Sequence, residues 1–196
     1  MSDDWSSDWR AAWQPLIDMV GKDLSEGEVI WGADAVEAGA IRRYLEPLEF
    51  DCPLHYDREV ARAHGYADII APYTGSSPFT AAPLWVPGTG VFDKAERNAQ
   101  PMIKGLRPPL PPEAPPFTGY FATDMEMDYL RPVLVGERLG RRGRKLVDCR
   151  VKETKVGRGA FCTFETETIT DKGEVVARMR FSLYCYNNHP QSEVSA

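Results

Sequence analysis

The chain has 196 residues, which is enough for one substantial domain and too few for two typical ones. Hydrophobic residues make up 43% of it and charged residues 27%, proportions that exclude a mainly disordered chain. The net charge of -6 argues against nucleic acid as a partner. The basic residues gather in one stretch, which is more typical of a solvated strand face than of a phosphate-binding site: Arg138, Arg141, Arg142, Arg144 and Lys145.

The N-terminal sequence and the cysteines bear on the cellular compartment. The chain opens with the acidic Met1-Ser2-Asp3-Asp4, whereas a secretory signal needs positive charge followed by an apolar run. No apolar stretch approaches the roughly 20 residues that span a bilayer. The four cysteines have no CxxC or metal-ligand spacing: Cys52, Cys149, Cys162 and Cys185. This distribution favours reduced thiols, and we predict a cytoplasmic protein that binds no metal.

Residues 1–29 predict an N-terminal helical extension. Apolar side chains recur every three or four residues, the spacing of one helical face: Trp5, Trp9, Trp13, Leu16 and Val20. The stripe lacks the basic polar face of a membrane-surface helix. We therefore expect it to pack on the domain or on a partner subunit.

Two further helices are expected around a loop that carries Asp51 and His55. The apolar pattern from Asp34 to about Glu46 is helical, and Pro47 is expected to end that helix. Asp57 then predicts an N-cap for a short helix over residues 58–64, stopped by Gly65. The loop thus lies between two helix ends.

Residues 74–84 are small and apolar, and they predict a buried helix with Pro78 in its first turn and Pro83 at its end. Residues 86–118 then lose periodicity and become rich in proline. This insertion favours a semi-rigid loop or lid over a polyproline ligand for a recognition domain.

The last third of the chain predicts antiparallel strands. Polar and apolar residues alternate over 124–129, the period of a strand with one solvated face. Gly136 and Glu137 lead into a long strand that reaches about Thr154. Two more strands are expected over 161–170 and 175–186, separated by a turn at 171–173, and residues 187–196 read as a polar tail.

The candidate site is centred on His55, which follows Pro53 and lies near several carboxylates: Glu46, Glu49, Asp51 and Asp57. An imidazole titrates near neutral pH and can move protons between water and a substrate. A structural alternative is a loop histidine that hydrogen-bonds the backbone. The sequence has no phosphate loop, GxGxxG, GxSxG or HExxH motif, which argues against the commonest nucleotide, hydrolase and zinc-protease sites.

The order of several motifs resembles the MaoC-like (R)-specific enoyl-thioester hydratases and dehydratases of the hot-dog superfamily. The matching segments are Pro53-Leu54-His55, Ala61 with Gly65, Ile69-Ile70-Ala71-Pro72, Tyr129-Leu130-Arg131-Pro132-Val133 and Gly136-Glu137-Arg138-Leu139. The Ala71-Pro72-Tyr73-Thr74 segment is similar to the N-terminal type of these domains. The resemblance implies a single α+β hot-dog domain over residues 30–186, with an antiparallel sheet wrapped around a long central helix at 74–84.

This resemblance implies a hydro-lyase that adds or removes water across the double bond of an enoyl thioester. The substrate would carry coenzyme A or an acyl carrier, and no other cofactor is implied. The tunnel would lie between two hot-dog domains, in a homodimer or in a heteromer with a second hot-dog chain. Two alternatives stay open: a non-catalytic subunit that pairs with a catalytic chain, or a hot-dog protein with another lyase, isomerase or thioesterase activity.

The catalytic motif of the family resembles Gly-Asp-x-Asn-Pro-Leu-His. When its histidine is aligned with His55, Phe50 stands in the aspartate position and Cys52 in the asparagine position. We predict His55 as the catalytic histidine, with Asp51 and then Glu49 as its carboxylate. Backbone amides near Tyr73 and Thr74, together with Cys52, are expected to contact the substrate.

Overall fold

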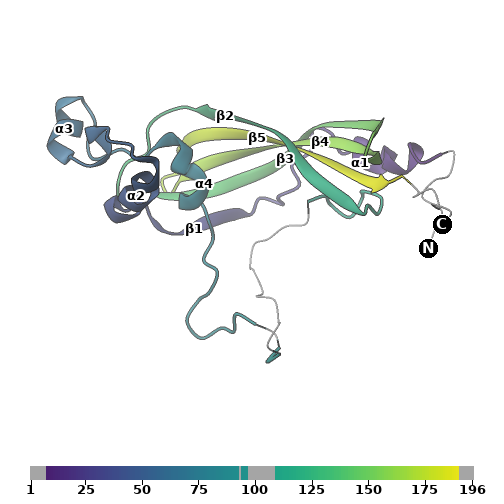
Figure 1. Ribbon diagram of the computed structural model, residues 1–196, viewed down its shortest axis with the longest axis horizontal. Coiled ribbons are helices and arrows are strands. Elements are labelled where there is room, and N and C mark those ends of the chain that lie inside the picture. The colour runs from purple at the N-terminus through teal and green to yellow at the C-terminus, as the bar shows by residue number, and fades with distance from the viewer. Residues whose placement is uncertain (1–7, 93, 97–108, 190–196) are drawn as a thin grey trace, which may run out of the picture.

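The computed structural model describes residues 8–92, 94–96 and 109–189. Trp5, much of the proline-rich insertion and the end of the C-terminal tail therefore lie outside the described residues. A long, curled sheet runs along the molecule (Figure 1). Helices α2, α3 and α4 gather near one end of the strands and α1 lies near the other (Figure 1).

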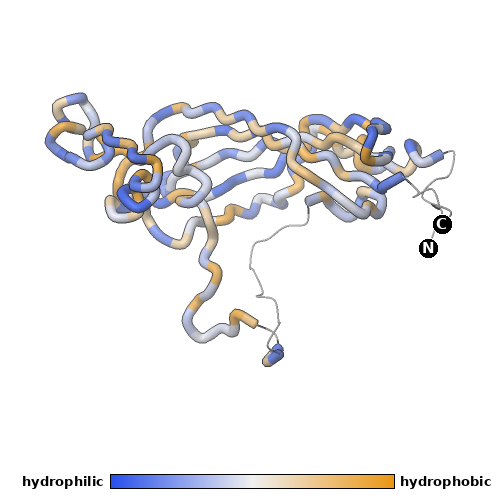
Figure 2. The backbone as a smooth tube through the Cα atoms, in the orientation of Figure 1, coloured by the Kyte–Doolittle hydropathy of each residue, from blue (hydrophilic) through white to orange (hydrophobic). Residues whose placement is uncertain are grey.

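The sheet has five strands in the order β1-β3-β4-β5-β2, and every neighbouring pair is antiparallel. The strands are β1 (Val29–Ala35), β2 (Gly119–Tyr129), β3 (Arg138–Thr154), β4 (Gly157–Thr170) and β5 (Val175–Asn188). Four of them follow the alternating segments predicted from the sequence. Hydrophilic and hydrophobic residues are interspersed along these strands (Figure 2), as expected for strands with one buried face.

Strand β1 was not predicted, since residues 1–29 were assigned to a helical extension and Asp34 to the start of a helix. The strand pairs with β3, with Ile30 opposite Arg141. Gly32 allows the chain to pass close to the following helical segment, because a β-carbon there would overlap the carbonyl oxygen of Phe79. This contact is formed between distant segments and has no local signature.

The next helix is shorter than predicted. It is α2 (Ala38–Leu45), followed by the 3-10 turn η2 (Glu46–Leu48), which contains Pro47 in its first turn rather than being ended by it. Glu49 then adopts a left-handed backbone conformation and turns the chain away. The short helix α3 (Arg58–Ala63) follows the 3-10 turn η3 (Pro53–His55), close to the predicted position.

The long central helix predicted over 74–84 is wrong. The chain forms only the 3-10 turn η4 (Tyr73–Gly75) and the single turn α4 (Ser76–Phe79). Two serines, a glycine and a proline give this segment low helix propensity. Beyond it, the carbonyl of Ala81 accepts a hydrogen bond from Ala33 on β1, so the chain leaves the helix to pair with the sheet.

The N-terminal stripe packs on the domain, although the helix is shorter than expected. Only η1 (Ala11–Trp13) and α1 (Gln14–Ile17) are helical, and Val20 is exposed. Trp9, Trp13 and Leu16 are buried in one cluster with residues from three strands and from the segment before β2: Leu110, Leu146, Ala160, Cys162, Phe164, Leu183 and Cys185. Of the helices in the described ranges, none combines the length and apolar character needed to cross a bilayer.

A second core joins α2 to the opposite end of the sheet. Its buried members are Val36, Ile41, Leu45, Ile69, Ala71, Leu139 and Val176, with Phe79 packed against them. The two cores meet the same sheet near its two ends. The second core holds the helical segments near His55 against one end of the strands.

The cap of α3 offers a test of this local structure. The carboxylate of Asp57 accepts hydrogen bonds from the backbone N–H groups of Glu59 (2.8 Å) and Val60 (3.1 Å), as predicted. Replacing Asp57 with alanine should lower the free energy of unfolding by about 1 kcal/mol, measured by urea denaturation. Asp57→Asn, which can still cap, is the control. Equal losses in both variants would show that the cap does not stabilise the helix.

Candidate functional site

His55 is the last residue of the 3-10 turn η3 and is 9% exposed. Pro53 occupies the first turn, where its fixed φ suits a helical start and its missing N–H costs nothing. The N–H of Asp57 donates to the carbonyl of Pro53, which closes the turn before α3. The local sequence therefore determines where the imidazole is anchored.

The ring of His55 is oriented by one hydrogen bond. Its Nδ1 lies 2.7 Å from the carbonyl oxygen of Ile70, and a carbonyl can only accept, so Nδ1 carries the proton. The N–H of Ile70 in turn donates to the carbonyl of Leu54. Within the described residues, Nε2 makes no hydrogen bond. In this neutral tautomer Nε2 has the free lone pair that a general base needs.

The predicted carboxylates lie on the surface. Asp51 and Glu49 are exposed, and within the described ranges neither forms a hydrogen bond or ion pair with His55. Both line a shallow depression with Arg42, Leu45, Glu46, Phe50 and Tyr56. His55 does not line it.

Phe50, which stands in the family's aspartate position, lies beside the imidazole instead. The centroids of the Phe50 and His55 rings are 5.6 Å apart. The hydroxyl of Tyr56 donates to the carbonyl of Phe50 at 2.6 Å and thereby holds this part of the loop. The aromatic ring of Phe50 thus lies beside His55, where the sequence analysis expected a carboxylate partner.

Of the predicted substrate-binding residues, Tyr73 lines a small pocket at the end of the sheet. Its ring centroid is 4.8 Å from that of Tyr129, and the volume of the pocket is only about 20 Å³. The other lining residues are mostly apolar: Ala71, Pro72, Ser76, Phe79, Arg131, Val133, Leu139, Thr168, Val176 and Ala177. Thr74 is exposed and does not line it, and Cys52 is half-buried.

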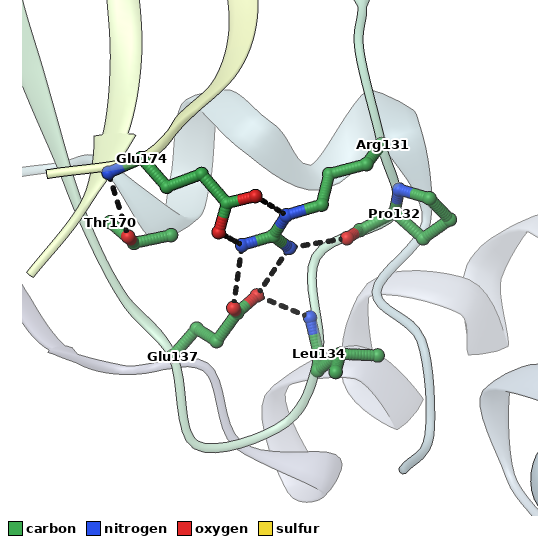
Figure 3. A network of polar contacts seen from close by, with 6 residues as sticks. All are labelled: Arg131, Pro132, Leu134, Glu137, Thr170 and Glu174. Carbon is green, nitrogen blue, oxygen red and sulfur yellow. Dashed lines mark hydrogen bonds and ion pairs between the residues drawn. The ribbon is translucent and has the colours of Figure 1, made fainter. Parts of the chain in front are cut away.

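A network around Arg131 closes the same end of the sheet (Figure 3). The guanidinium donates to both oxygens of Glu137 at 2.8 and 3.0 Å, and to both oxygens of Glu174 at 2.6 and 2.9 Å. The hydrogen bonds to Glu174 and then Glu137 raise the pKa of Arg131, and the pKa of Glu174 is lowered below its usual range by Arg131. In the sequence, Arg131 and Glu137 were noted only as parts of family motifs, and Glu174 was not singled out.

This network positions the backbone that orients His55. Glu137 also accepts from the N–H of Leu134 at 2.8 Å, which fixes the loop between β2 and β3. The Ile69–Ala71 segment is hydrogen-bonded to that loop. The N–H of Ala71 donates to the carbonyl of Val133, and the N–H of Val135 donates to the carbonyl of Ile69. Arg131 therefore acts on His55 indirectly, through the carbonyl of Ile70.

Between the two cores, the sheet carries an open groove of about 290 Å³ that was not predicted from the sequence. It is lined by Ile30, Pro109, Arg141, Gly143, Arg144, Phe164, Thr166, Met179, Phe181 and Leu183. On β4, Thr166 in the groove and Thr168 in the Tyr73 pocket are two residues apart, so both openings lie on one face of the sheet. The serine, glycine and proline content of 74–84 was the signal that the covering helix is short.

The basic side chains of residues 138–145 make different kinds of contact. Arg142 forms an ion pair with Glu167 at 2.7 Å, and Arg138 donates to the carbonyl of Gly32. Arg144 lies over the ring of Phe164 in the groove and donates to the carbonyl of Pro109. Within the described part of the chain, no group of three or more His, Cys, Asp or Glu residues is arranged to hold a metal ion.

Comparison with known proteins assigns the family. The model of the FAS1-like dehydratase domain region matches residues 27–179, most of the chain. The chain belongs to this family. The predicted membership of the MaoC-like hot-dog group is thereby confirmed, with a curled five-stranded antiparallel sheet but without the long central helix.

The chain is similar to individual proteins in sequence or in fold. The chain is 28% identical over 166 residues to a probable enoyl-CoA hydratase alpha subunit of Thermomonospora curvata, covering 84% of this chain and 48% of the relative, so it spans about half that protein's length. Its fold matches a chain of the ChsH1-ChsH2 complex from Mycobacterium tuberculosis, with a TM-score of 0.62, 21% identity and 94% of both chains covered. A MaoC-like dehydratase from Rhodospirillum rubrum gives 0.50, with 20% identity over 87% of this chain and 99% of that one.

The Arg131 network predicts a dependence of stability on acid. Because the pKa of Glu174 is lower in the folded chain than its ordinary value, its contribution is present above that ordinary value and is lost as the pH falls through the folded value. Glu174→Gln should therefore lose less stability than the wild type between about pH 5 and about pH 3 in urea titrations. Asp171→Asn, in the same turn, is the control and should follow the wild type. Identical acid profiles for Glu174→Gln and wild type would contradict this role.

Proposed function

We propose that this chain is a hot-dog subunit of an enoyl-thioester hydratase, adding or removing water at the double bond of an acyl thioester, most simply a coenzyme A ester. The hydrogen bond from Nδ1 of His55 to Ile70 carries this proposal, because it leaves Nε2 as a base toward water. The family assignment and the relative named as a probable enoyl-CoA hydratase alpha subunit support the same reaction class.

The reaction needs more than one proton-transfer group. A base activates water for attack on Cβ, an acid delivers a proton to Cα, and hydrogen-bond donors stabilise the enolate that develops on the thioester oxygen. We assign the base to His55. The acid is Asp51 or Glu49 after a shift of their loop, or a carboxylate from a partner chain. Backbone amides near Tyr73 are our candidates for the thioester oxygen.

The acyl group is proposed to lie in the open groove on the sheet, which is large enough for it, with the small Tyr73 pocket at one end. The Tyr73 pocket adjoins the groove along β4, and the side chains between them are largely uncharged. The short α4 leaves this surface open. An acyl chain entering beside Tyr73 would exchange water for contacts with Met179 and Phe181.

We further propose that the partner is a second hot-dog chain that pairs with the edge strand β2. One side of β2 pairs with β5, and the strand lies at the edge of the described sheet. Large apolar side chains on it are exposed: Tyr120, Phe121, Met125 and Tyr129. A long exposed edge of this kind is a template for strand pairing. The curated relative, about twice as long, is named a subunit, and the ChsH1-ChsH2 relative is a complex.

A non-catalytic subunit is the second candidate. The position of Phe50 beside His55, and the surface location of Asp51 and Glu49, support a chain that shapes the tunnel of a catalytic partner. In that case His55 serves only to hold Ile70.

Substitutions at His55 separate the two candidates. Asparagine can still donate to the carbonyl of Ile70 but cannot act as a base near neutral pH, whereas alanine loses both functions. If His55 is the base, both variants should reduce hydration of crotonyl-type and bulkier enoyl-CoA esters by a factor of about 10²–10⁴, assayed on the purified protein together with any partner chain that copurifies with it. Full activity in a folded His55→Asn variant would favour the non-catalytic subunit.

A charge on the edge strand should disrupt the assembly. Met125→Lys places a cation on the exposed edge, which disfavours strand pairing, so we expect the mass measured by light scattering to fall to that of the single chain. Val156→Lys, at an exposed apolar position of the β3–β4 turn, is the matched control and should leave the mass unchanged. An unchanged mass for Met125→Lys would place the interface elsewhere.

A further inference from the structure

Cys149 and Cys162 form a close pair that the sequence analysis did not recognise. They lie directly opposite each other on the antiparallel strands β3 and β4. Their sulfur atoms are 3.8 Å apart, although the residues are 13 positions apart in the chain. Both are free thiols in the structure.

The two thiols differ in exposure and in acidity. Cys162 is fully buried in the core that contains Trp13 and Leu16, whereas Cys149 is half-buried at the edge of that core. The Cys162 thiol donates a hydrogen bond to the Cys149 sulfur, which lowers the pKa of Cys149 and raises the pKa of Cys162. The more accessible sulfur is therefore the one that more readily becomes a thiolate.

We propose that Cys149 and Cys162 are a redox modification site, which low-molecular-weight disulfides such as oxidised glutathione convert to a cross-strand disulfide. The site lies outside the hydratase machinery and does not depend on the proposed function. Cys149 is the attacking thiol and Cys162 the resolving thiol.

The exchange balances without any further reactant. The Cys149 thiolate attacks one sulfur of oxidised glutathione, forming a mixed disulfide and releasing one glutathione thiolate. Cys162 loses its proton and attacks the Cys149 sulfur, which forms the protein disulfide and releases a second glutathione. Two protein thiols are oxidised, one glutathione disulfide is reduced, and the two protons pass to the two released glutathiones.

The sheet can accommodate this bond with a small adjustment. Opposite residues of antiparallel strands have β-carbons about 4.5–5.5 Å apart, and a disulfide needs about 3.5–4.5 Å. The register of β3 against β4 breaks between Leu146 and Asp148, beside Cys149, where the backbone is not held by a regular ladder. Cys185 does not compete as the opposite residue, because it faces Ala160, and burial raises its pKa to about 12.

The test uses the full-length reduced chain, equilibrated in glutathione buffers of increasing oxidised fraction, quenched in acid and alkylated. Mass spectrometry should show a species in which two cysteines are not alkylated because they form a disulfide, and trypsin should release peptide 146–150 joined to peptide 159–172. Dithiothreitol should reverse the link. Cys52→Ser and Cys185→Ser should both retain it.

A Cys162→Ser variant identifies the order of attack. Without the resolving thiol, the mixed disulfide with glutathione should accumulate on Cys149. The proposal is overturned if the wild-type chain accumulates that mixed disulfide without the cross-link, links other cysteines, or leaves Cys149 reduced while Cys52 reacts. The wild-type peptide map decides the matter even if the serine variant does not fold.

Discussion

The segment Ile69–Ala71 is the constraint on which the candidate site depends. Its backbone is hydrogen-bonded to the loop between β2 and β3 on one side, while the carbonyl of Ile70 orients His55 on the other. The loop is held in turn by Arg131 through Glu137. A guanidinium between two carboxylates is thus linked, through successive hydrogen bonds, to the carbonyl that orients an imidazole it does not touch.

The short helix α4 changes what the sheet can do. In the fold that the motifs resemble, a long helix covers the sheet, but here one helical turn and the N-terminal residues Trp13 and Leu16 cover its two ends. The surface between them carries the groove. Loss of helical cover costs buried apolar area, and the second core and the docked N-terminal segment offset part of that cost.

Much of the fold could be predicted where the signal is local. Alternation of polar and apolar residues located β2, and glycine-containing turns separated β4 from β5. The cap at Asp57 was also correct, because it depends only on the four consecutive residues 57–60. The helix over 74–84 was wrong because its end is determined by pairing of Ala81 with β1, which lies about 50 positions earlier in the chain.

The sequence by itself determined the family, the antiparallel strands and the position of His55 behind Pro53, since these follow from ordered motifs, periodicity and the restricted φ of proline. Only the tertiary structure decided which groups surround that histidine: the Ile70 carbonyl and the Phe50 ring lie beside it, while Asp51 and Glu49 lie on the surface. It also brought Cys149 and Cys162 together. The physical reason is that strand register and loop closure place residues in space, and neither can be read from spacing along the chain.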